Sequence, residues 1–312
     1  MGSGAEVTFR AVLIAGPTAS GKSALAAALA QRFGGVVINA DSMQVYRDLS
    51  VITARPTPEE MGDVPHHLYG HVDGATNHSV AAYAAEAGAL LNAFAGQGHL
   101  PVLVGGTGLY FKALTEGLSA IPPVPEAVRV SFRAHAAERT TGELHAELSE
   151  QDPEMAAKLR PSDRLRVMRA LEVLAATGRS LSSFQGERQP GPLAGARLLQ
   201  IFLAPERELV RERIDRRFDA MMTAGALEEV AALRERRLDP LLPVMRAHGV
   251  PGLIAHLDGT LTLEEAMARG KADTRAYAKR QVTWFRHQMA GWHAVAPEAG
   301  LAFALAELEQ AG

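Results

Sequence analysis

Apolar and polar positions alternate along the first third of the chain in a pattern that predicts strands and helices in turn. Short apolar runs at 11–15, 36–40, 68–72 and 101–104 are typical of buried strands, and helical patterns cover 24–33 and 79–95. A further apolar run at 197–203 predicts another strand, beyond which we expect mostly helix. This order predicts an α/β fold in which a parallel sheet is covered by helices on both faces.

Two segments rich in proline and glycine, 121–125 and 186–195, interrupt this pattern. The sequence between them has helical patterning and no convincing strand. We therefore expect a helical insertion domain at 122–195, inside a core domain formed by 1–121 and 196–312.

The turn after the first predicted strand contains a complete phosphate-binding motif. Its residues match G-x-x-x-x-G-K-[ST] without a gap, between a strand and a helix: Gly16, Pro17, Thr18, Ala19, Ser20, Gly21, Lys22 and Ser23. Backbone N–H groups in such a loop surround an anion, and the following helix adds partial positive charge. The lysine reaches the outer phosphates, and the Ser23 hydroxyl can bind Mg²⁺. The motif predicts a P-loop NTPase-like core that holds a di- or triphosphate.

The acid that P-loop hydrolases need is absent from its usual place. The strand at 101–104 runs into Gly105-Gly106-Thr107-Gly108, whereas the strand at 36–40 ends in Asp41. Asp41 would lie beside the phosphates and is a candidate general base. The alternative is that it caps the next turn. Thr107 has the same two interpretations, a hydroxyl for a reacting group or a helix cap.

Composition narrows the functional class. A net charge of −3 with 47% hydrophobic residues is typical of a globular protein and gives no overall attraction to nucleic acid. The absence of cysteine excludes disulfides and zinc–thiolate sites. The sequence has no long apolar span and no evident signal peptide, so we expect a cytoplasmic protein without membrane contact.

Local clusters of basic residues could attract nucleic acid even though the net charge does not. Residues 269–286 hold six Lys and Arg against one acid, with aromatic residues among them. Helical spacing places Lys271, Arg275 and Lys279 on one stripe, which suits a nucleic-acid backbone or, equally, a solvated helix face.

Taken together, these segments resemble the tRNA dimethylallyltransferases. The resemblance spans about residues 10–292 and rests on the P-loop, 41–46 (Asp-Ser-Met-Gln-Val-Tyr), 53–56 (Thr-Ala-Arg-Pro), 65–68 (Pro-His-His-Leu), 104–110, 169–173, 213–218 and 278–286. It implies that the loop grips dimethylallyl diphosphate in place of ATP, and that the adenine N6 of a flipped base attacks the allylic carbon. Asp41 then accepts the N6 proton, Thr107 completes the adenine site, and Thr18, Lys22, Arg217 and Mg²⁺ on Ser23 stabilise the leaving diphosphate.

The resemblance also implies contacts with the anticodon stem-loop of tRNA, and a monomer without an obligate protein partner. The positions concerned, among which Gln44 would read the base, are Asp41, Ser42, Met43, Gln44, Thr107, Arg129, Leu165, Arg166, Val167, Met168, Arg169, Arg246, Gly249, Lys279 and Arg280. Two positions depart from the family pattern: Leu165 replaces a glutamine, and Val250-Pro251 replaces Tyr-Arg.

Two other functions remain as alternatives. A small-molecule kinase would share the P-loop and the Asp41 base but would use ATP. A nucleotide-gated RNA-binding protein would need the basic clusters but neither Asp41 nor Thr107. Asp41→Ala separates an enzyme, which would lose turnover, from a binding module, which would keep its affinity.

Overall fold

The structure is a computed structural model that describes residues 9–95, 97–186 and 188–310. These residues form two compact units. The first takes the chain up to Thr115 and again from Gly191 onward, and the second takes Glu116–Pro190.

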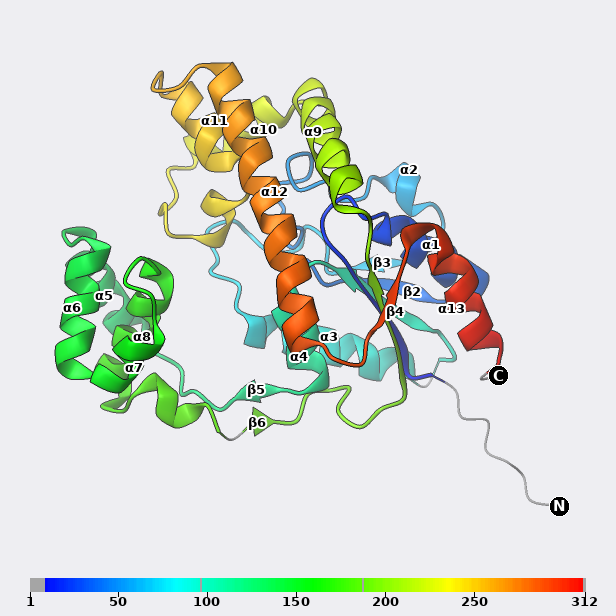
Figure 1. The fold of residues 1–312 in the computed structure, drawn as a ribbon, viewed down its shortest axis with the longest axis horizontal. Helices are drawn as coiled ribbons and strands as arrows, with labels where there is room; N and C mark the ends of the chain where they lie inside the picture. Colours follow the sequence, from blue (N-terminus) through cyan, green and yellow to red (C-terminus); the bar gives the residue numbers. More distant parts are fainter. Residues whose placement is uncertain (1–8, 96, 187, 311–312) are drawn as a thin grey trace. The chain divides into compact units, whose positions relative to one another are not determined.

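The first unit is built on a six-stranded sheet whose paired strands all run parallel, in the order β3-β2-β4-β1-β7-β8 (Figure 1). The strands are β1 (Ala11–Ala15), β2 (Val36–Asn39), β3 (His66–His67), β4 (Pro101–Gly105), β7 (Leu198–Leu203) and β8 (His293–Val295). β1 lies in the middle, so the loop that follows it is at the centre of the edge where the strands end. The parallel α/β core predicted from the sequence is confirmed.

Each face of the sheet is covered by helices because successive side chains of a strand point to opposite sides. Val12 and Ile14 of β1 pack with α1 (Lys22–Arg32) and α13 (Gly300–Glu309), which lie side by side. Leu13 and its neighbours pack on the other side with α3 (Val80–Ala95) and α4 (Gly108–Thr115). All five residues of β1 are fully buried, as expected of a central parallel strand.

A second layer of helices in this unit packs on the segment that follows β2. It consists of α9 (Arg207–Thr223), α10 (Ala226–Glu235), the 3₁₀ helix η2 (Pro243–Arg246), α11 (Val250–Leu257) and the long α12 (Leu263–Gln288). Their apolar faces enclose Val45, Tyr46, Leu49 and Ile52. The short helix α2 (Pro58–Met61) follows, and η3 (Pro297–Ala299) precedes α13. This layer therefore fixes the loop in which Asp41 and Gln44 lie.

The second unit is helical. Its elements are α5 (Glu126–Ala137), α6 (Thr141–Gln151), α7 (Pro153–Lys158), α8 (Arg164–Thr177) and η1 (Leu181–Phe184), with β5 (Leu118–Ser119) and β6 (Arg188–Gln189) paired antiparallel at its two ends. Side-chain caps begin three of these α-helices, from Thr140, Asp152 and Asp163. The buried side chains include Phe132, Leu144, Leu148, Met155 and Leu171.

One predicted strand differs in the structure, and short strands occur where the sequence showed no strand pattern. The expected strand at 68–72 is two residues earlier and shorter, because Leu68 and Gly70 adopt positive φ angles of 62° and 57° that end it. β8 lies in the region expected to be mostly helical, and β6 lies where no strand was expected. Both are too short and too exposed to show an apolar pattern.

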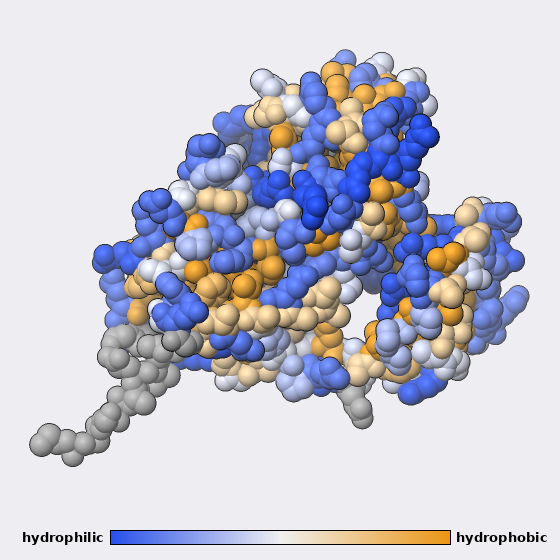
Figure 2. All heavy atoms as spheres, turned by 180° about the vertical axis from the view of Figure 1, so that it is seen from behind, coloured by the Kyte–Doolittle hydropathy of each residue, from blue (hydrophilic) through white to orange (hydrophobic). Residues whose placement is uncertain are grey.

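The surface mixes hydrophilic and apolar residues. Hydrophilic residues cover much of the face seen from behind, with apolar residues interspersed among them (Figure 2). Among the residues that the structure describes, no helix is both long and apolar enough to cross a membrane.

Candidate active site

The P-loop connects β1 to α1 through backbone conformations that turn its N–H groups inward. Ala19 and Gly21 have positive φ angles of 62° and 87°, and the Ser20 N–H donates to the Pro17 carbonyl at 3.3 Å. α1 begins at Lys22 and has no acidic residue in its first turn. The first N–H groups of α1, which have no carbonyl partner within the helix, and the helix dipole therefore favour an anion here.

Two cations are held close to this loop. The Lys22 ammonium donates to the Pro17 carbonyl at 3.3 Å, and the Arg217 guanidinium of α9 donates to the Thr18 hydroxyl. Burial lowers the pKa of Lys22 to about 8, with Asp41 opposing and Arg217 adding to that effect. Burial also lowers the pKa of Arg217, again against the attraction of Asp41. Two partly dehydrated cations therefore lie where an incoming anion would stabilise both of their charged forms.

Local hydrogen bonds hold Asp41 in place at the end of β2. The buried Asn39 side chain accepts from the Asp41 N–H at 2.9 Å and donates to the Asp41 and Leu68 carbonyls at 2.9 and 3.0 Å. The Oδ1 atom of Asp41 accepts from the Met43 N–H at 2.9 Å, which is the capping role that the sequence left open. Among the described residues no donor is bonded to Oδ2, so capping does not use up the carboxylate.

Thr107 joins the loop after β4 to the loop that holds Asp41. Its hydroxyl accepts from the Ser42 N–H at 2.9 Å and donates to the Ser42 Oγ at 3.2 Å, and its N–H donates to the Ala40 carbonyl at 3.2 Å. α4 begins at the next residue, Gly108. The structure thus brings Asp41 and Thr107 together at one edge of the sheet.

Gln281 of α12 is a site residue to which the sequence gave no role. Its Oε1 accepts from the Thr18 N–H at 3.0 Å, and its Nε2 donates to the Gly106 carbonyl at 2.9 Å, with only 5% of the residue exposed. A Cβ at Gly106 would lie 2.0 Å from this Nε2, so the contact requires glycine there. The amide therefore braces the P-loop against the loop after β4.

Two cavities meet at Arg217. A cavity of about 850 Å³ lies over the P-loop and is lined by residues 19–23, 50–51, 54–58, Arg213 and Arg217, among others. A smaller one of about 70 Å³ is lined by Thr18, Asp41, Met43, Arg217, His248 and Tyr277, among others. In the smaller cavity the rings of His248 and Tyr277 lie 4.6 Å apart, and burial lowers the pKa of His248 and raises that of Tyr277. The cavity over the P-loop and the cavity that contains the Asp41 carboxylate and its aromatic neighbours thus share Arg217 in their linings.

Comparison with known proteins shows the family to which the chain belongs. The IPP transferase family model matches residues 44–288, and the isopentenyl transferase model matches residues 9–69. The chain belongs to the IPP transferase family. The tRNA dimethylallyltransferase of Methylobacterium sp. (strain 4-46) is 69% identical over 94% of this chain and 96% of its own. The resemblance inferred from the motifs is confirmed.

Solved structures agree with this family assignment. The tRNA isopentenylpyrophosphate transferase of Bacillus halodurans is 36% identical, with a TM-score of 0.69 over 96% of this chain and 97% of that one. A eukaryotic dimethylallyltransferase acting on tRNA is 30% identical, with a TM-score of 0.76 over 92% of this chain and 73% of that one.

Positions in the helical unit that the family resemblance implicated in RNA contacts divide into two groups. Val167 and Met168 are buried among the helices of that unit, so their side chains serve packing. Leu165 is 49% exposed, and Arg166 is exposed at the same end of α8. Among the described residues, the ion pairs of Arg129, Arg166 and Arg169 are with neighbours on their own helices or caps, at 3.4–3.8 Å. Such pairs are weak enough to exchange for phosphate.

The positions implicated in RNA contacts in the core unit also include both exposed residues and residues that are buried or bonded within the protein. Gln44 donates its amide hydrogens to the Thr53 and Ala54 carbonyls at 3.0 and 2.9 Å, which leaves only its Oε1 for a base. Arg246, Lys279 and Arg280 are exposed. Gly249 is buried at φ 97°, and beside it the substituted Val250 is fully buried where α11 begins. Val250 therefore fills space inside the helical layer.

Two of the three basic residues on the α12 stripe form ion pairs with acidic residues of α9. Lys271 contacts Asp219 at 2.6 Å, and Arg275 contacts Asp215 at 2.5 and 2.8 Å, so both side chains join α12 to α9. Lys279, the third residue of the stripe, remains exposed, as does the next residue, Arg280, and both can meet a ligand.

Proposed function

We propose that this chain is a tRNA dimethylallyltransferase. It transfers the dimethylallyl group of dimethylallyl diphosphate to N6 of the adenosine 3′ of the anticodon. The N6–C1 bond forms as the allylic C1–O bond breaks, diphosphate leaves, and one N6 proton passes to a base. The products are N6-isopentenyladenosine in tRNA and diphosphate.

The observation that carries this proposal is the position of the Asp41 carboxylate. It lines a cavity together with Thr18 and Arg217, while the P-loop lines a larger cavity that also has Arg217 in its lining. An exocyclic amine is a weak nucleophile, and it gains most from a carboxylate that takes its proton as the bond forms. Oδ1 accepts from the Met43 N–H, and no donor among the described residues is bonded to Oδ2, which is therefore open for that proton.

The remaining groups stabilise the leaving diphosphate. Lys22, Arg217 and the N–H groups of the P-loop face charge that grows on the diphosphate as the C–O bond breaks. Gln281 keeps the loop in place, and Thr107 positions the Asp41 loop through Ser42. Tyr277 and His248 supply aromatic faces for an adenine beside Asp41.

The family points to a divalent metal, and we propose Mg²⁺ at Ser23. The Ser23 hydroxyl is exposed at the start of α1 and lines the P-loop cavity. One hard oxygen donor, completed by diphosphate oxygens and water, fits the way Mg²⁺ binds in phosphate sites. The ion would supply charge stabilisation for the diphosphate.

We further propose that exposed and partly exposed cations of both units hold the anticodon arm. Arg129, Arg166 and Arg169 belong to the helical insertion, and Arg246, Lys279 and Arg280 to the core. Such contacts position the RNA through its phosphates, while the flipped adenine supplies selectivity. This function needs one chain and no protein partner, and it belongs where tRNA is processed, in the cytoplasm.

The test is to identify the product nucleoside. Purified protein is incubated with Mg²⁺, dimethylallyl diphosphate and an anticodon stem-loop with consecutive adenosines, and the digested RNA is analysed by mass spectrometry. We expect isopentenyladenosine at the position 3′ of the anticodon and none when that position is guanosine. An RNA that stays unmodified under all donor concentrations would refute the proposal.

A further inference from the structure

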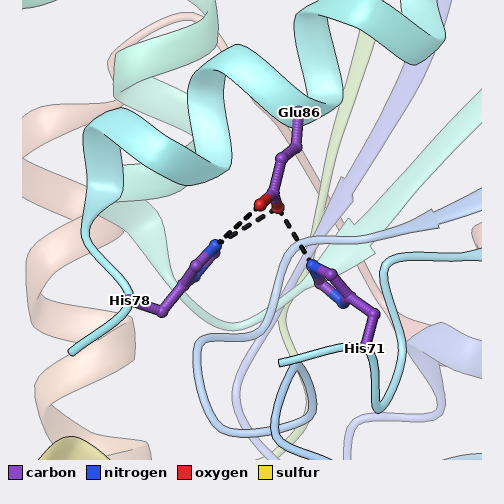
Figure 3. A group of neighbouring side chains, drawn as sticks. All are labelled: His71, His78 and Glu86. Atoms are coloured by element: carbon purple, nitrogen blue, oxygen red, sulfur yellow. Dashed lines mark hydrogen bonds and ion pairs between the residues drawn. The ribbon is translucent and has the colours of Figure 1, made fainter. Parts of the chain in front are cut away.

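Two histidines and a glutamate form a cluster that the proposed reaction does not use (Figure 3). Glu86 belongs to α3, His78 lies just before the start of that helix, and His71 lies in the loop between β3 and α3. Both rings face the Glu86 carboxylate: His71 Nε2 lies 3.0 Å and His78 Nε2 3.2 Å from Oε2. One nitrogen of each histidine and one carboxylate oxygen lie within 4.8 Å of one another.

These separations suit a shared metal ion. With metal–ligand bonds of about 2.0–2.1 Å, neighbouring ligand atoms of a tetrahedral site lie about 3.4 Å apart. The two His–Glu distances are within a few tenths of an ångström of that value. His71 is exposed, so its ring has the freedom to complete the site by a small rotation.

Burial fixes one ligand in place. The His78 side chain is only 4% exposed, and among the described residues its Nδ1 is buried without a hydrogen-bond partner. Hydrogen bonding to Glu86 therefore satisfies only one of the two ring nitrogens. A metal bond at Nε2 would replace that hydrogen bond and hold the buried ring through the same nitrogen.

We propose that His71, His78 and Glu86 bind a divalent transition metal ion, and that Zn²⁺ is the ion that suits them. Two imidazoles and one carboxylate are a known ligand set for zinc, whereas Mg²⁺ prefers oxygen donors alone. Three protein ligands leave a fourth position for water. The site is separate from the diphosphate site and does not depend on the proposed function.

The ion would stabilise the loop that precedes α3. The same loop is bonded to the segment after Asp41: the Gly70 and Val72 N–H groups donate to the Gln44 and Val45 carbonyls at 2.9 Å, and the Arg47 N–H donates to the Val72 carbonyl at 2.9 Å. A metal that ties His71 to α3 therefore also restrains the segment 44–47. Its role is structural.

The test measures Zn²⁺ binding to the metal-free full-length protein by titration calorimetry in excess Mg²⁺. We expect one equivalent to bind to the wild type. His71→Ala and Glu86→Gln each remove a ligand and should weaken binding at least about 10- to 100-fold, the loss seen when outer partners of a metal are removed. His71 and Glu86 are both at least partly exposed, so their replacement should not disturb packing, and circular dichroism verifies that the variants fold.

A matched control is available in the helical unit. His135 Nε2 lies 2.9 Å from Glu147 Oε2, a pair that lacks a second histidine, so His135→Ala should leave Zn²⁺ affinity unchanged. Zn²⁺ should raise the Tm of the wild type and of His135→Ala but not of the two ligand variants. Absence of binding to the wild type would overturn the proposal and leave Glu86 as a hydrogen-bond bridge. Equal binding to His71→Ala and the wild type would also overturn it.

Discussion

The lowered pKa of Lys22 makes diphosphate binding depend on pH in a calculable way. Free Lys22 has a pKa of about 8 because burial disfavours its charge. A bound diphosphate favours the ammonium form and raises that pKa. The free protein must therefore take up a proton at Lys22 whenever it binds diphosphate above pH 8.

The size of the effect follows from the pKa. With a pKa of about 8, the ammonium fraction is about 0.9 at pH 7, 0.5 at pH 8 and 0.1 at pH 9. Binding should take up about 0.1, 0.5 and 0.9 proton at these pH values, and affinity should fall about tenfold between pH 7 and 9. Dimethylallyl diphosphate is titrated calorimetrically in buffers with different ionisation enthalpies, which yields the proton uptake directly.

Two variants test whether Lys22 is the group responsible. Lys22→Arg keeps its charge throughout this range, so its affinity should not depend on pH in this way. Lys22→Met should bind weakly, again without proton uptake. A wild-type protein that takes up no proton at pH 9, or an uptake that survives in Lys22→Met, would refute the account of Lys22.

The other predictions concern catalysis, stability and RNA contact. Asp41→Ala should lose several orders of magnitude in turnover and still bind dimethylallyl diphosphate; near-normal turnover would exclude the general base. Gln281→Met leaves the Thr18 N–H and the Gly106 carbonyl unpaired, which should cost about 2–4 kcal/mol of unfolding free energy and raise the KM for the donor; an unchanged urea midpoint would contradict this. Because the folded pKa of Lys22 lies below its unfolded value, the free protein should gain about 2 kcal/mol of unfolding free energy as pH rises from 8 to 10, a gain that Lys22→Met lacks in pH-dependent denaturation. Neutralising Lys279 and Arg280 should weaken tRNA binding and flatten its salt dependence; an unaltered slope would make this part of α12 structural.

The features predicted correctly from sequence are those that short stretches of chain determine. The P-loop lies between a buried strand and a helix, and both its residue types and its neighbours are local. The position of Asp41 at the end of β2 follows from the apolar run before it. Placing Thr107 beside it required only that parallel strands end at one edge of the sheet.

The features that were missed depend on packing between distant segments. Gln281 meets Thr18 across 263 positions of sequence, so its role cannot be seen before α12 is placed. The sequence left Lys271 and Arg275 open to an RNA backbone or a solvated helix face, and the structure pairs them with acids of α9. The edge strand β8 gave no pattern because its short run is largely exposed.

The most direct test of the central claim is to ask which donor the P-loop serves. Purified protein with Mg²⁺ and the anticodon stem-loop is offered labelled dimethylallyl diphosphate and, in parallel, ATP labelled on its terminal phosphate. We predict that label moves from the prenyl donor to RNA, that ATP stays intact, and that Asp41→Ala abolishes the transfer. Consumption of ATP without prenylation of RNA would contradict the account and make the chain a kinase.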